Sequence, residues 1–455
     1  MPKTFIDLFA GIGGFHWALE DMGYTCRLAV EKDTAAQDIY KYNFPEKTVR
    51  SKPSEYIKNK LIGDIRSLTR SDPDEETTER EVNEIETLLR EDYGIKKGDI
   101  SIICGGFPCQ PFSKSGEQKG DKDITRGTLF RDILLLVEAI EPDYLFLENV
   151  RNLAGPKHKE TLNTIIQRIR LLKYVVEDDP IILSPHQLSQ DDGSPQIRER
   201  AFILAHRKGV NAADSLKNIS LQINKIKKSN KTKWDAKNIL IENKNVKKKY
   251  FVGKQEQLWL KSWDQFLNIT QKHKLPGFPI WTEDFDDKKS KISGEPEWKQ
   301  KFRKQNREFY LKLCKCPKLR EKIRIWLQKI RKFPASRRKF EWQASSAFKD
   351  GEKRSLQKLL IQLRPSGIRV KPPTHYPALV AITQTTIVGP KLQKGGNSNQ
   401  FRYITPSEAA RLQGMTKIKF KNQSDALCYK QLGNAVNIKV IKYLAERLMG
   451  KSDGS

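Results

Sequence analysis

The residue best placed to do chemistry is Cys109, which lies between Pro108 and Pro111. The apolar run 99–103 predicts a buried parallel strand, and the glycines and prolines after it predict a loop at the carboxyl end of that strand. Open α/β sheets present their reactive groups there. Because proline restricts φ, such a loop would hold the thiol in a fixed direction. The alternative is a structural cysteine, since free cysteine is among the most buried residue types.

A glycine turn indicates a second site. Residues 5–10 predict a short buried strand, residues 11–14 a turn rich in glycine, and residues 15–20 the start of a helix. This arrangement suits nucleotide-type cofactors, because glycine lets a ligand approach the backbone. The spacing is not Gly-x-Gly-x-x-Gly, and a glycine turn alone is a weak indicator. Glu31, at the tip of the next predicted strand, suits a ribose diol or is a plain surface acid, and Asp64 could meet an adenine amino group.

Two later predicted strands carry charged residues that could take part in chemistry. One strand ends at Glu148, and the other contains Arg198 and Arg200. Glu148 comes directly after the apolar run 142–147 and could protonate a substrate, although a lone glutamate at a strand end is more often a capping acid. The segment 195–205 predicts a strand on which Arg198 and Arg200 share one face, because they are two residues apart. Two guanidinium groups on one face can meet one anion or one base edge.

The distribution of charge predicts a polyanionic partner. The 455 residues include 84 basic and 55 acidic ones, a net charge of +29. Residues 207–400 hold 46 basic and 16 acidic side chains, so the rest of the chain is nearly neutral. Seven of the eight tryptophans also follow Arg207, which predicts a folded core rather than a basic tail. This segment is therefore expected to be a nucleic-acid surface, with a solvated lysine-rich face as the alternative.

Cysteine usage and hydropathy exclude several classes of protein. The six cysteines show no framework spacing, which predicts reduced thiols in a cytosolic protein. Cys314 and Cys316 lack a second pair at zinc-site spacing, so no metal is expected. No apolar run approaches the roughly 18 residues that span a bilayer.

The first residues lead directly into a strand without a signal peptide. The charged stretch 67–97 is expected to be an exposed helical insertion with no chemistry of its own.

Taken in order, these motifs resemble those of the cytosine-5 DNA methyltransferase family of restriction-modification type. The resemblance covers most of the chain except the tryptophan-rich segment. The matching motifs are Asp7–Phe15, Glu31, Gly63–Ile65, Gly106–Gln110, Arg126–Phe130, Glu148–Val150, Gln196–Arg200, Thr405–Gly414 and Gly433–Val436. Each motif alone is modest, but the complete ordered set is specific.

The resemblance implies an α/β fold with a doubly wound, mostly parallel sheet, the Rossmann-like fold of S-adenosylmethionine-dependent methyltransferases. It places the catalytic domain at 1–206 and a smaller basic target-recognition domain at 207–400. A return segment at 401–455 would complete the catalytic domain with its C-terminal helix. The basic excess, which follows from composition without reference to any family, lies in the implied recognition segment.

The resemblance also implies a sequence-specific DNA (cytosine-5-)-methyltransferase. Cys109 would attack carbon 6 of a flipped-out cytosine, and Glu148 would bind the exocyclic amine and protonate ring nitrogen 3. Carbon 5 would take the methyl group of S-adenosylmethionine. Arg200, with Arg198, would hold the cytosine carbonyl oxygen and a nearby phosphate. By matching position, the residues that line the cofactor site would be Phe9, Gly11, Gly14, Glu31, Asp64, Ile65, Leu129 and Asn434.

One residue departs from the family pattern. Lys32 stands where relatives often place an apolar or aromatic residue against the adenine. Its aliphatic stem could still cover the ring.

The resemblance implies double-stranded DNA as partner, with no membrane and no metal. We expect a monomer in the bacterial cytoplasm, associated with the nucleoid and protecting host DNA in a restriction system. The same chemistry on RNA is one alternative, although a long basic segment favours base reading in duplex DNA. A catalytically silent regulator is a second, against which the intact Cys109, Glu148 and both arginines argue. A nicotinamide oxidoreductase, the third, leaves Cys109 and the basic segment unexplained. The sequence does not reveal the recognised DNA site.

Overall fold

The computed structural model describes residues 3–51, 54–69, 79–108, 129–229, 232–286, 294–381, 386–395 and 399–450. The chain forms two compact units. Unit 1 consists of Met1–Thr232, Ala378–Ile382 and Ala410–Ser455, and unit 2 consists of Lys233–Pro377 and Thr383–Ala409.

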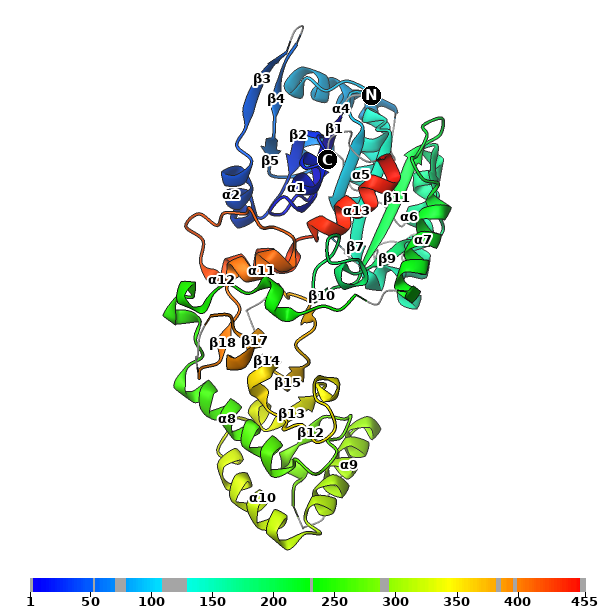
Figure 1. Ribbon diagram of the computed structural model, residues 1–455. Helices are drawn as coiled ribbons and strands as arrows, with labels where there is room; N and C mark the ends of the chain where they lie inside the picture. Colours follow the sequence, from blue (N-terminus) through cyan, green and yellow to red (C-terminus); the bar gives the residue numbers. More distant parts are fainter. Residues whose placement is uncertain are drawn as a thin grey trace. The chain divides into compact units, whose positions relative to one another are not determined.

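Unit 1 is built on a mostly parallel sheet of order β5-β2-β1-β6-β7-β11-β8, with β9 also pairing to β11 (Figure 1). Its strands are β1 (Thr4–Leu8), β2 (Thr25–Val30), β5 (Lys60–Ile62), β6 (Ile102–Gly106), β7 (Tyr144–Val150), β8 (Tyr174–Val176), β9 (Ile181–Leu183) and β11 (Arg200–Arg207). The five strands from β5 to β7 are parallel, and β11 is antiparallel to its neighbours. The predicted α/β fold with a mostly parallel sheet is confirmed.

The order of the strands changes direction between β1 and β6. The chain moves from β1 outward through β2 to β5 and then returns to add β6 on the other side of β1. At such a switch point, ligands bind beyond the carboxyl ends of the strands, because the two connections leave in opposite directions. The glycine turn follows β1 and the cysteine loop follows β6, so both predicted sites start from this one edge.

Most helices of unit 1 pack on the two faces of this sheet, while α12 (Asp425–Asn434) lies away from it (Figure 1). The other helices are α1 (Gly14–Glu20), α2 (Thr34–Asn43), α3 (Arg66–Thr69), α4 (Glu79–Tyr93), α5 (Leu129–Ile140), α6 (Lys159–Leu171), α7 (Leu216–Ser229) and α13 (Ile438–Met449). Leu145 and Leu147 of β7 share one core with α4, α5 and α6. Phe146 points the other way and meets Phe15 of α1 edge to face, with the ring centroids 5.2 Å apart. Because α13 packs on α1, the two ends of the chain lie together in this unit (Figure 1).

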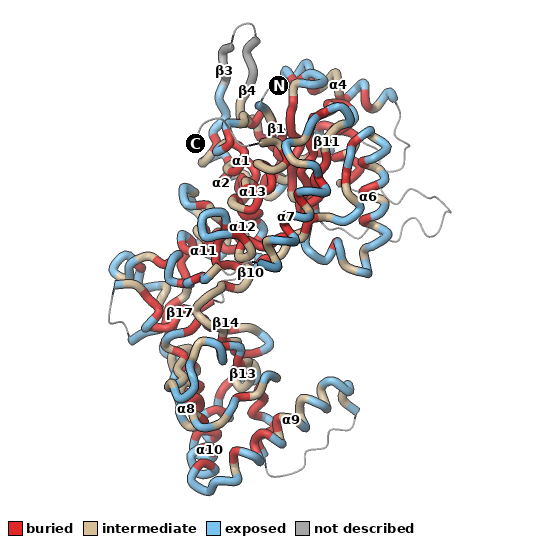
Figure 2. The backbone as a smooth tube through the Cα atoms, turned by 45° about the vertical axis from the view of Figure 1, so that its right-hand side comes forward, coloured by how far each residue is buried: buried red, intermediate tan, exposed pale blue. Residues whose placement is uncertain are grey.

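Unit 2 has a six-stranded sheet of order β12-β13-β15-β14-β17-β18. Its strands are β12 (Ile280–Trp281), β13 (Lys339–Trp342), β14 (Leu360–Arg364), β15 (Gly367–Lys371), β17 (Thr386–Val388) and β18 (Arg402–Tyr403), and its helices are α8 (Lys254–Ile269), α9 (Glu297–Leu313) and α10 (Pro317–Ile330). Trp263 and Trp326 are fully buried in its core, and Trp263 stacks on Phe340 with the ring centroids 4.5 Å apart. Buried and exposed stretches alternate along α10 (Figure 2). The folded core predicted from the tryptophans is confirmed.

The shorter elements complete the description. They are β3 (Lys47–Ser51) and β4 (Ser54–Lys58), which pair as a hairpin, together with β10 (Gln196–Ile197), β16 (Tyr376–Pro377) and α11 (Pro406–Leu412).

The units divide at other positions than the sequence predicted. The composition changes near Arg207, but the chain stays in unit 1 up to Thr232. The amides of Ala213 and Asp214 donate to carbonyls of α13, which attaches the start of this basic stretch to unit 1. Residues 378–381, inside the segment 207–400, also belong to unit 1 and form no strand.

Candidate active site

The described stem of the cysteine loop is fixed to the end of β7. Cys109 itself lies outside the described residues, as do residues 110–128. Phe107 and Pro108 continue from β6, and the buried Asn149 side chain donates from Nδ2 to the Phe107 carbonyl at 3.1 Å. Asn149 directly follows Glu148, so this hydrogen bond links the loop that leads to Cys109 with the strand end that carries the glutamate.

Glu148 is held at the carboxyl end of β7, between β6 and β11. It is 8% exposed, and its Oε1 accepts from Nε of Arg200 at 2.9 Å. On the other side it stands opposite Gly106, where a Cβ atom would lie 3.1 Å from Oε2. Burial raises the pKa of Glu148 above its usual value, although Arg200 and Arg198 oppose the shift. A carboxyl group in this environment can hold a proton closer to neutral pH than an exposed one.

Arg198 and Arg200 do not share a strand face as predicted. Arg200 begins β11, whereas Arg198 lies in the irregular link between β10 and β11. The buried Arg198 guanidinium donates to the carbonyls of Leu379, Gly433 and Ala435 at 3.1, 2.8 and 3.0 Å. Burial lowers the pKa of Arg198 to about 9. Alternation of side chains applies only inside a strand, and the strand is interrupted between these two arginines.

A cavity of about 280 Å³ opens at the carboxyl ends of β1, β2 and β5. It is lined by Phe9, Val30, Glu31, Lys32, Gly63, Asp64, Ile65, Arg66, Pro108 and Leu129. Five of the eight residues predicted for the cofactor therefore line one cavity. Of the other five, Lys32 was considered as an adenine contact. The cofactor prediction missed Val30, Gly63, Arg66 and Pro108, for which only their positions beside predicted residues gave a signal.

Glu31, which lines the cavity, also binds the backbone of the glycine turn. Its Oε2 accepts from the Gly11 amide and its Oε1 from the Asp33 amide, both at 2.7 Å. Gly11 has φ +55°, and a Cβ there would meet nothing within 4 Å, so a ligand could approach this backbone closely. Phe9 adopts φ +57°, which is strained for a bulky residue and is typical of functional sites.

Gly11, Gly14 and Asn434, the other three predicted residues, are not among the described residues that line the cavity. Gly14 faces Val436, and a Cβ at Gly14 would come within 2.5 Å of Val436 Cγ2. Asn434 is exposed at the end of α12. The motif Gly433–Val436 is therefore placed against the glycine turn by packing, while the role of Asn434 at a cofactor stays a prediction.

A model of the family "C-5 cytosine-specific DNA methylase" matches residues 3–73 and 74–450. The chain belongs to this family. It is 33% identical over 520 residues to Type II methyltransferase M.AluI of Cellulosimicrobium cellulans, covering 97% of this chain and 91% of that protein. It is 37% identical over 207 residues to Type II methyltransferase M.HhaI of Haemophilus parahaemolyticus, covering 46% of this chain and 50% of that protein. The resemblance found in the sequence is confirmed, and with it the enzyme class, a C-5 cytosine-specific DNA methyltransferase.

Among solved structures, the chain resembles a mutant DNMT2 of Spodoptera frugiperda with a TM-score of 0.48 and 16% identity, over 97% of this chain and 98% of that one.

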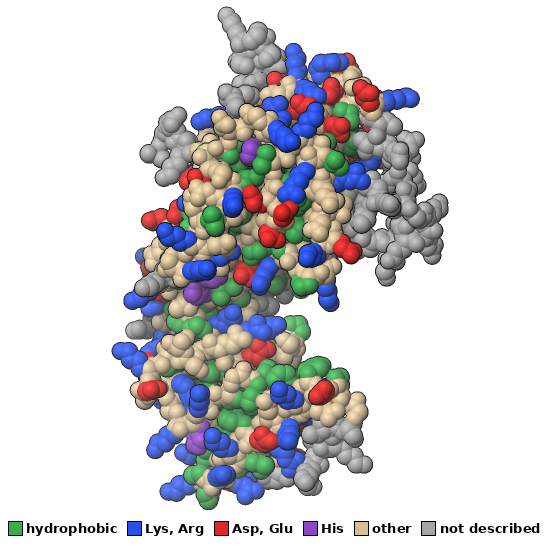
Figure 3. Space-filling view, turned by 90° about the vertical axis from the view of Figure 1, so that its right-hand side faces the viewer, with side chains coloured by type: hydrophobic (Ala, Val, Ile, Leu, Met, Phe, Trp, Pro, Cys, Tyr) green, Lys and Arg blue, Asp and Glu red, His purple; other side chains and the backbone are tan. Residues whose placement is uncertain are grey.

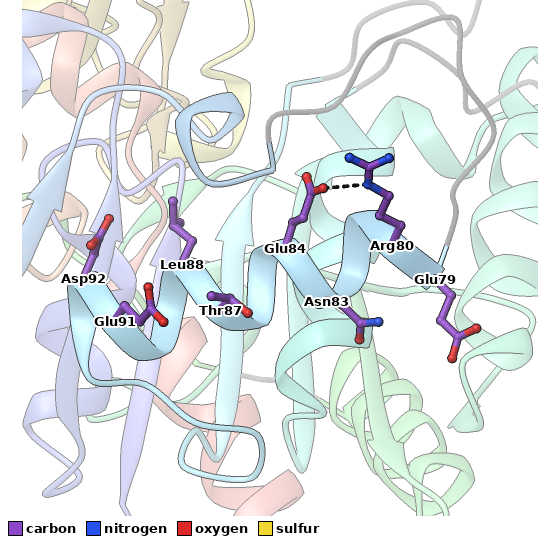
Figure 4. A pocket seen from close by; sticks show the side chains of 8 residues that line it. All are labelled: Glu79, Arg80, Asn83, Glu84, Thr87, Leu88, Glu91 and Asp92. Atoms are coloured by element: carbon purple, nitrogen blue, oxygen red, sulfur yellow. Dashed lines mark hydrogen bonds and ion pairs between the residues drawn. The ribbon is translucent and has the colours of Figure 1, made fainter.

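In this DNA methylase, the predicted insertion at 67–97 contains α4, which carries a surface hollow (Figure 4). All of the lining residues come from this one helix, and their side chains point in different directions. Arg80 and Glu84 form an ion pair between residues four apart, with 87% and 52% of their side chains exposed. Such a surface pair contributes little, and no set of groups converges on a common point. The hollow therefore lacks the features of a catalytic site.

Metal sites and membrane spans are both absent from the described part of the methylase. Within it, no cluster of three or more His, Cys, Asp and Glu residues is placed to hold a metal ion. No described helix has the length and hydropathy to cross a membrane.

Proposed function

We propose that this methylase transfers a methyl group from S-adenosylmethionine to carbon 5 of a flipped-out cytosine in a specific duplex DNA sequence. The observation that carries the proposal is the arrangement at one edge of the sheet. The ion pair between the buried Glu148 and the partly exposed Arg200 adjoins the stem of the Cys109 loop, and the cavity with Glu31 and Asp64 opens at the ends of neighbouring strands.

The chain's own residues would activate the cytosine. The Cys109 thiolate adds to carbon 6 and forms a carbon–sulfur bond, while Glu148 gives a proton to ring nitrogen 3. The electron pair of the 5,6 double bond then becomes available at carbon 5, which bonds to the incoming methyl group. Loss of the carbon-5 proton to solvent restores the double bond and releases the thiolate, and ring nitrogen 3 returns its proton to the Glu148 carboxylate. The raised pKa of Glu148 supports its role as the proton donor.

The two arginines have different roles in this proposal. Arg200 remains beside Glu148 and would hold the cytosine carbonyl oxygen, since it is 21% exposed and its fork donates in a plane. Arg198 would act as a positioning residue, because its guanidinium is already bonded to three main-chain carbonyls.

The cavity suits S-adenosylmethionine, which when bound supplies an electrophilic methyl group. Glu31 would accept from the ribose diol and Asp64 from the adenine amine, with Ile65 and Leu129 as apolar walls. Phe9 and the Gly11 backbone would form the side nearest the glycine turn. Gly14 supports this turn through Val436, and Asn434 is proposed to reach the cofactor from α12.

Unit 2 is proposed to recognise the DNA target. It contains most of the segment 207–400 with its excess of basic residues, and Lys and Arg side chains outnumber acidic ones on its face in Figure 3. Phosphates are bound by such surfaces and give salt-dependent affinity. Because the relatives M.AluI and M.HhaI are named Type II methyltransferases, we propose that the enzyme protects host DNA in a restriction-modification system, acting as a monomer at the nucleoid of a bacterial cell.

The experiment uses purified enzyme, methyl-labelled S-adenosylmethionine and mixed-sequence duplex DNA. Label at cytosine carbon 5, absent in the Cys109→Ser variant, is expected, and sequencing of the product would give the target. Label that appears only in an RNA substrate would mean that the enzyme acts on RNA and not on DNA. Tight DNA binding without transfer to either substrate would favour a silent DNA-binding protein.

A further inference from the structure

The cofactor cavity contains an ion pair between two of its lining residues. Lys32 follows Glu31 at the end of β2, and its Nζ lies 3.0 Å from Oδ2 of Asp64, beyond β5. Both residues line the cavity, so the ion pair crosses the wall on which the adenine amine is proposed to bind. The carboxylate of Asp64 is therefore bound by a cation of the protein itself.

The other oxygen of Asp64 is also engaged. Oδ1 accepts from the Arg66 amide at 3.1 Å, a local bond at the start of α3. The pKa of Asp64 is lowered, first by this hydrogen bond and then by Lys32, so the group is an anion at neutral pH. A ligand amine that approaches Asp64 meets a donor already in place at each oxygen, Lys32 at Oδ2 and the Arg66 amide at Oδ1. At Oδ2 it must share the oxygen with Lys32 or displace the lysine.

Displacing Lys32 requires little free energy. Its side chain is 82% exposed and that of Asp64 36%, so water and salt screen their attraction. Exposed pairs of this kind contribute little. The pair is thus weak enough to open on each binding event and strong enough to reduce affinity measurably.

We propose that Lys32 is a specificity-determining residue that competes with the purine amine for Asp64 and thereby lowers the affinity for the cofactor. The inference rests on the proposed S-adenosylmethionine site. A neutral side chain of similar length at position 32 would leave Oδ2 to the ligand. The gain in affinity should require the exocyclic amine of the purine. A purine that carries an oxygen at that position has no amine to donate to Asp64.

The test measures binding of S-adenosylhomocysteine, adenosine and inosine to the full-length protein by calorimetry. Lys32→Met keeps the aliphatic stem and removes the charge. We expect it to bind adenosine about two- to fivefold more tightly than the wild type, with a smaller gain for inosine. Adenosine is uncharged, so added salt should strengthen its binding to the wild type and leave the variant unchanged.

The matched control is Lys60→Met on β5. Lys60 pairs with Glu46 at 3.5 Å and is not among the described residues lining the cavity, so the variant removes the same charge without freeing Asp64. Equal or weaker adenosine binding by Lys32→Met than by wild type would overturn the inference while leaving the cofactor proposal standing. Failure of the wild type to bind S-adenosylhomocysteine would overturn both.

Discussion

At the scale of single residues, the protonation state of Glu148 controls the proposed chemistry. Burial raises its pKa, so a larger share of the carboxyl groups is protonated near neutral pH than in water. The protonated form is the one that donates to ring nitrogen 3. The contribution of Glu148 to the rate of methyl transfer should therefore be lost as the pH increases through this raised pKa.

The substitution Glu148→Gln tests this assignment. Glutamine keeps the shape and can hydrogen bond, but it cannot deliver a proton, so kcat should fall about 10²- to 10⁴-fold and the alkaline decline should vanish. Steady-state rates between pH 5.5 and 9 would measure both effects. Glu141→Gln serves as the control, because Glu141 is half-exposed and pairs with Lys97 at the opposite edge of the sheet. A wild-type pH profile in Glu148→Gln would contradict the assignment.

At the scale of elements, two consecutive glycines at the end of β6 have different tasks. A Cβ at Gly105 would lie 2.2 Å from the Leu8 carbonyl of β1, which only a backbone shift can relieve. A Cβ at Gly106 would lie 3.1 Å from Oε2 of Glu148, a side chain that can move slightly. The first glycine thus sets the spacing of two central strands, and the second leaves room for the glutamate.

Gly105→Ala should accordingly destabilise the fold by about 1–3 kcal/mol or more, because it forces overpacking between β1 and β6. Gly106→Ala should leave the melting temperature close to that of the wild type and lower kcat by shifting Glu148. Thermal unfolding followed by circular dichroism, together with transfer rates, separates the two. The assignment fails if Gly106→Ala is the less stable variant.

The two arginines provide a second contrast between structure and chemistry. Arg198→Met would leave three buried carbonyls of residues 379, 433 and 435 without their donor, and should cost on the order of 3 kcal/mol of stability. Arg200→Met removes the partner of Glu148 and should mainly lower kcat. The melting temperatures and rates of both variants would check this. A larger loss of stability in Arg200→Met would reverse the two roles.

The same pair of arginines shows what sequence could and could not predict. The ordered motifs predicted the fold, and five of the residues that line the cofactor cavity were predicted, because each motif is a short local segment at a strand end. The contacts of Arg198 depend on residues about 180 and 235 positions away, which no local pattern encodes. The Lys32–Asp64 pair escaped prediction for the same reason, since two separate strands bring it together.

At the scale of the whole molecule, the boundary of the basic segment and the boundary of the folded units differ. Composition changes at Arg207, yet residues up to Thr232 fold with unit 1 because α7 and the residues before it pack on α13. Charge is a surface property and can change within a unit, whereas a unit ends where its core ends. The change in charge at Arg207 therefore does not mark the end of a folded unit.

If unit 2 binds the DNA backbone, affinity should fall steeply with salt. Each phosphate that a lysine or arginine neutralises adds about −0.9 to the slope of log K against log salt, so six to ten such phosphates would weaken binding roughly 10³- to 10⁵-fold between 50 and 200 mM. Lys247–Lys249 are exposed in unit 2. Replacing all three by serine should weaken binding of every duplex sequence similarly. The slope should become shallower by about one for each phosphate that is no longer neutralised.

A matched triple variant replaces Lys96, Lys173 and Lys208, which are exposed at the amino edge of the unit 1 sheet, opposite the proposed site. This variant removes the same charge as the 247–249 variant. A general effect of net charge would therefore change the slope of log K against log salt equally in both variants. Fluorescence anisotropy over a range of salt concentrations would measure them. A shallower slope only for the 247–249 variant would assign phosphate binding to unit 2. If the two variants have equal slopes of log K against log salt, Lys247–Lys249 act only through the net charge. Direct binding of a phosphate by these lysines would change the slope of their own variant alone.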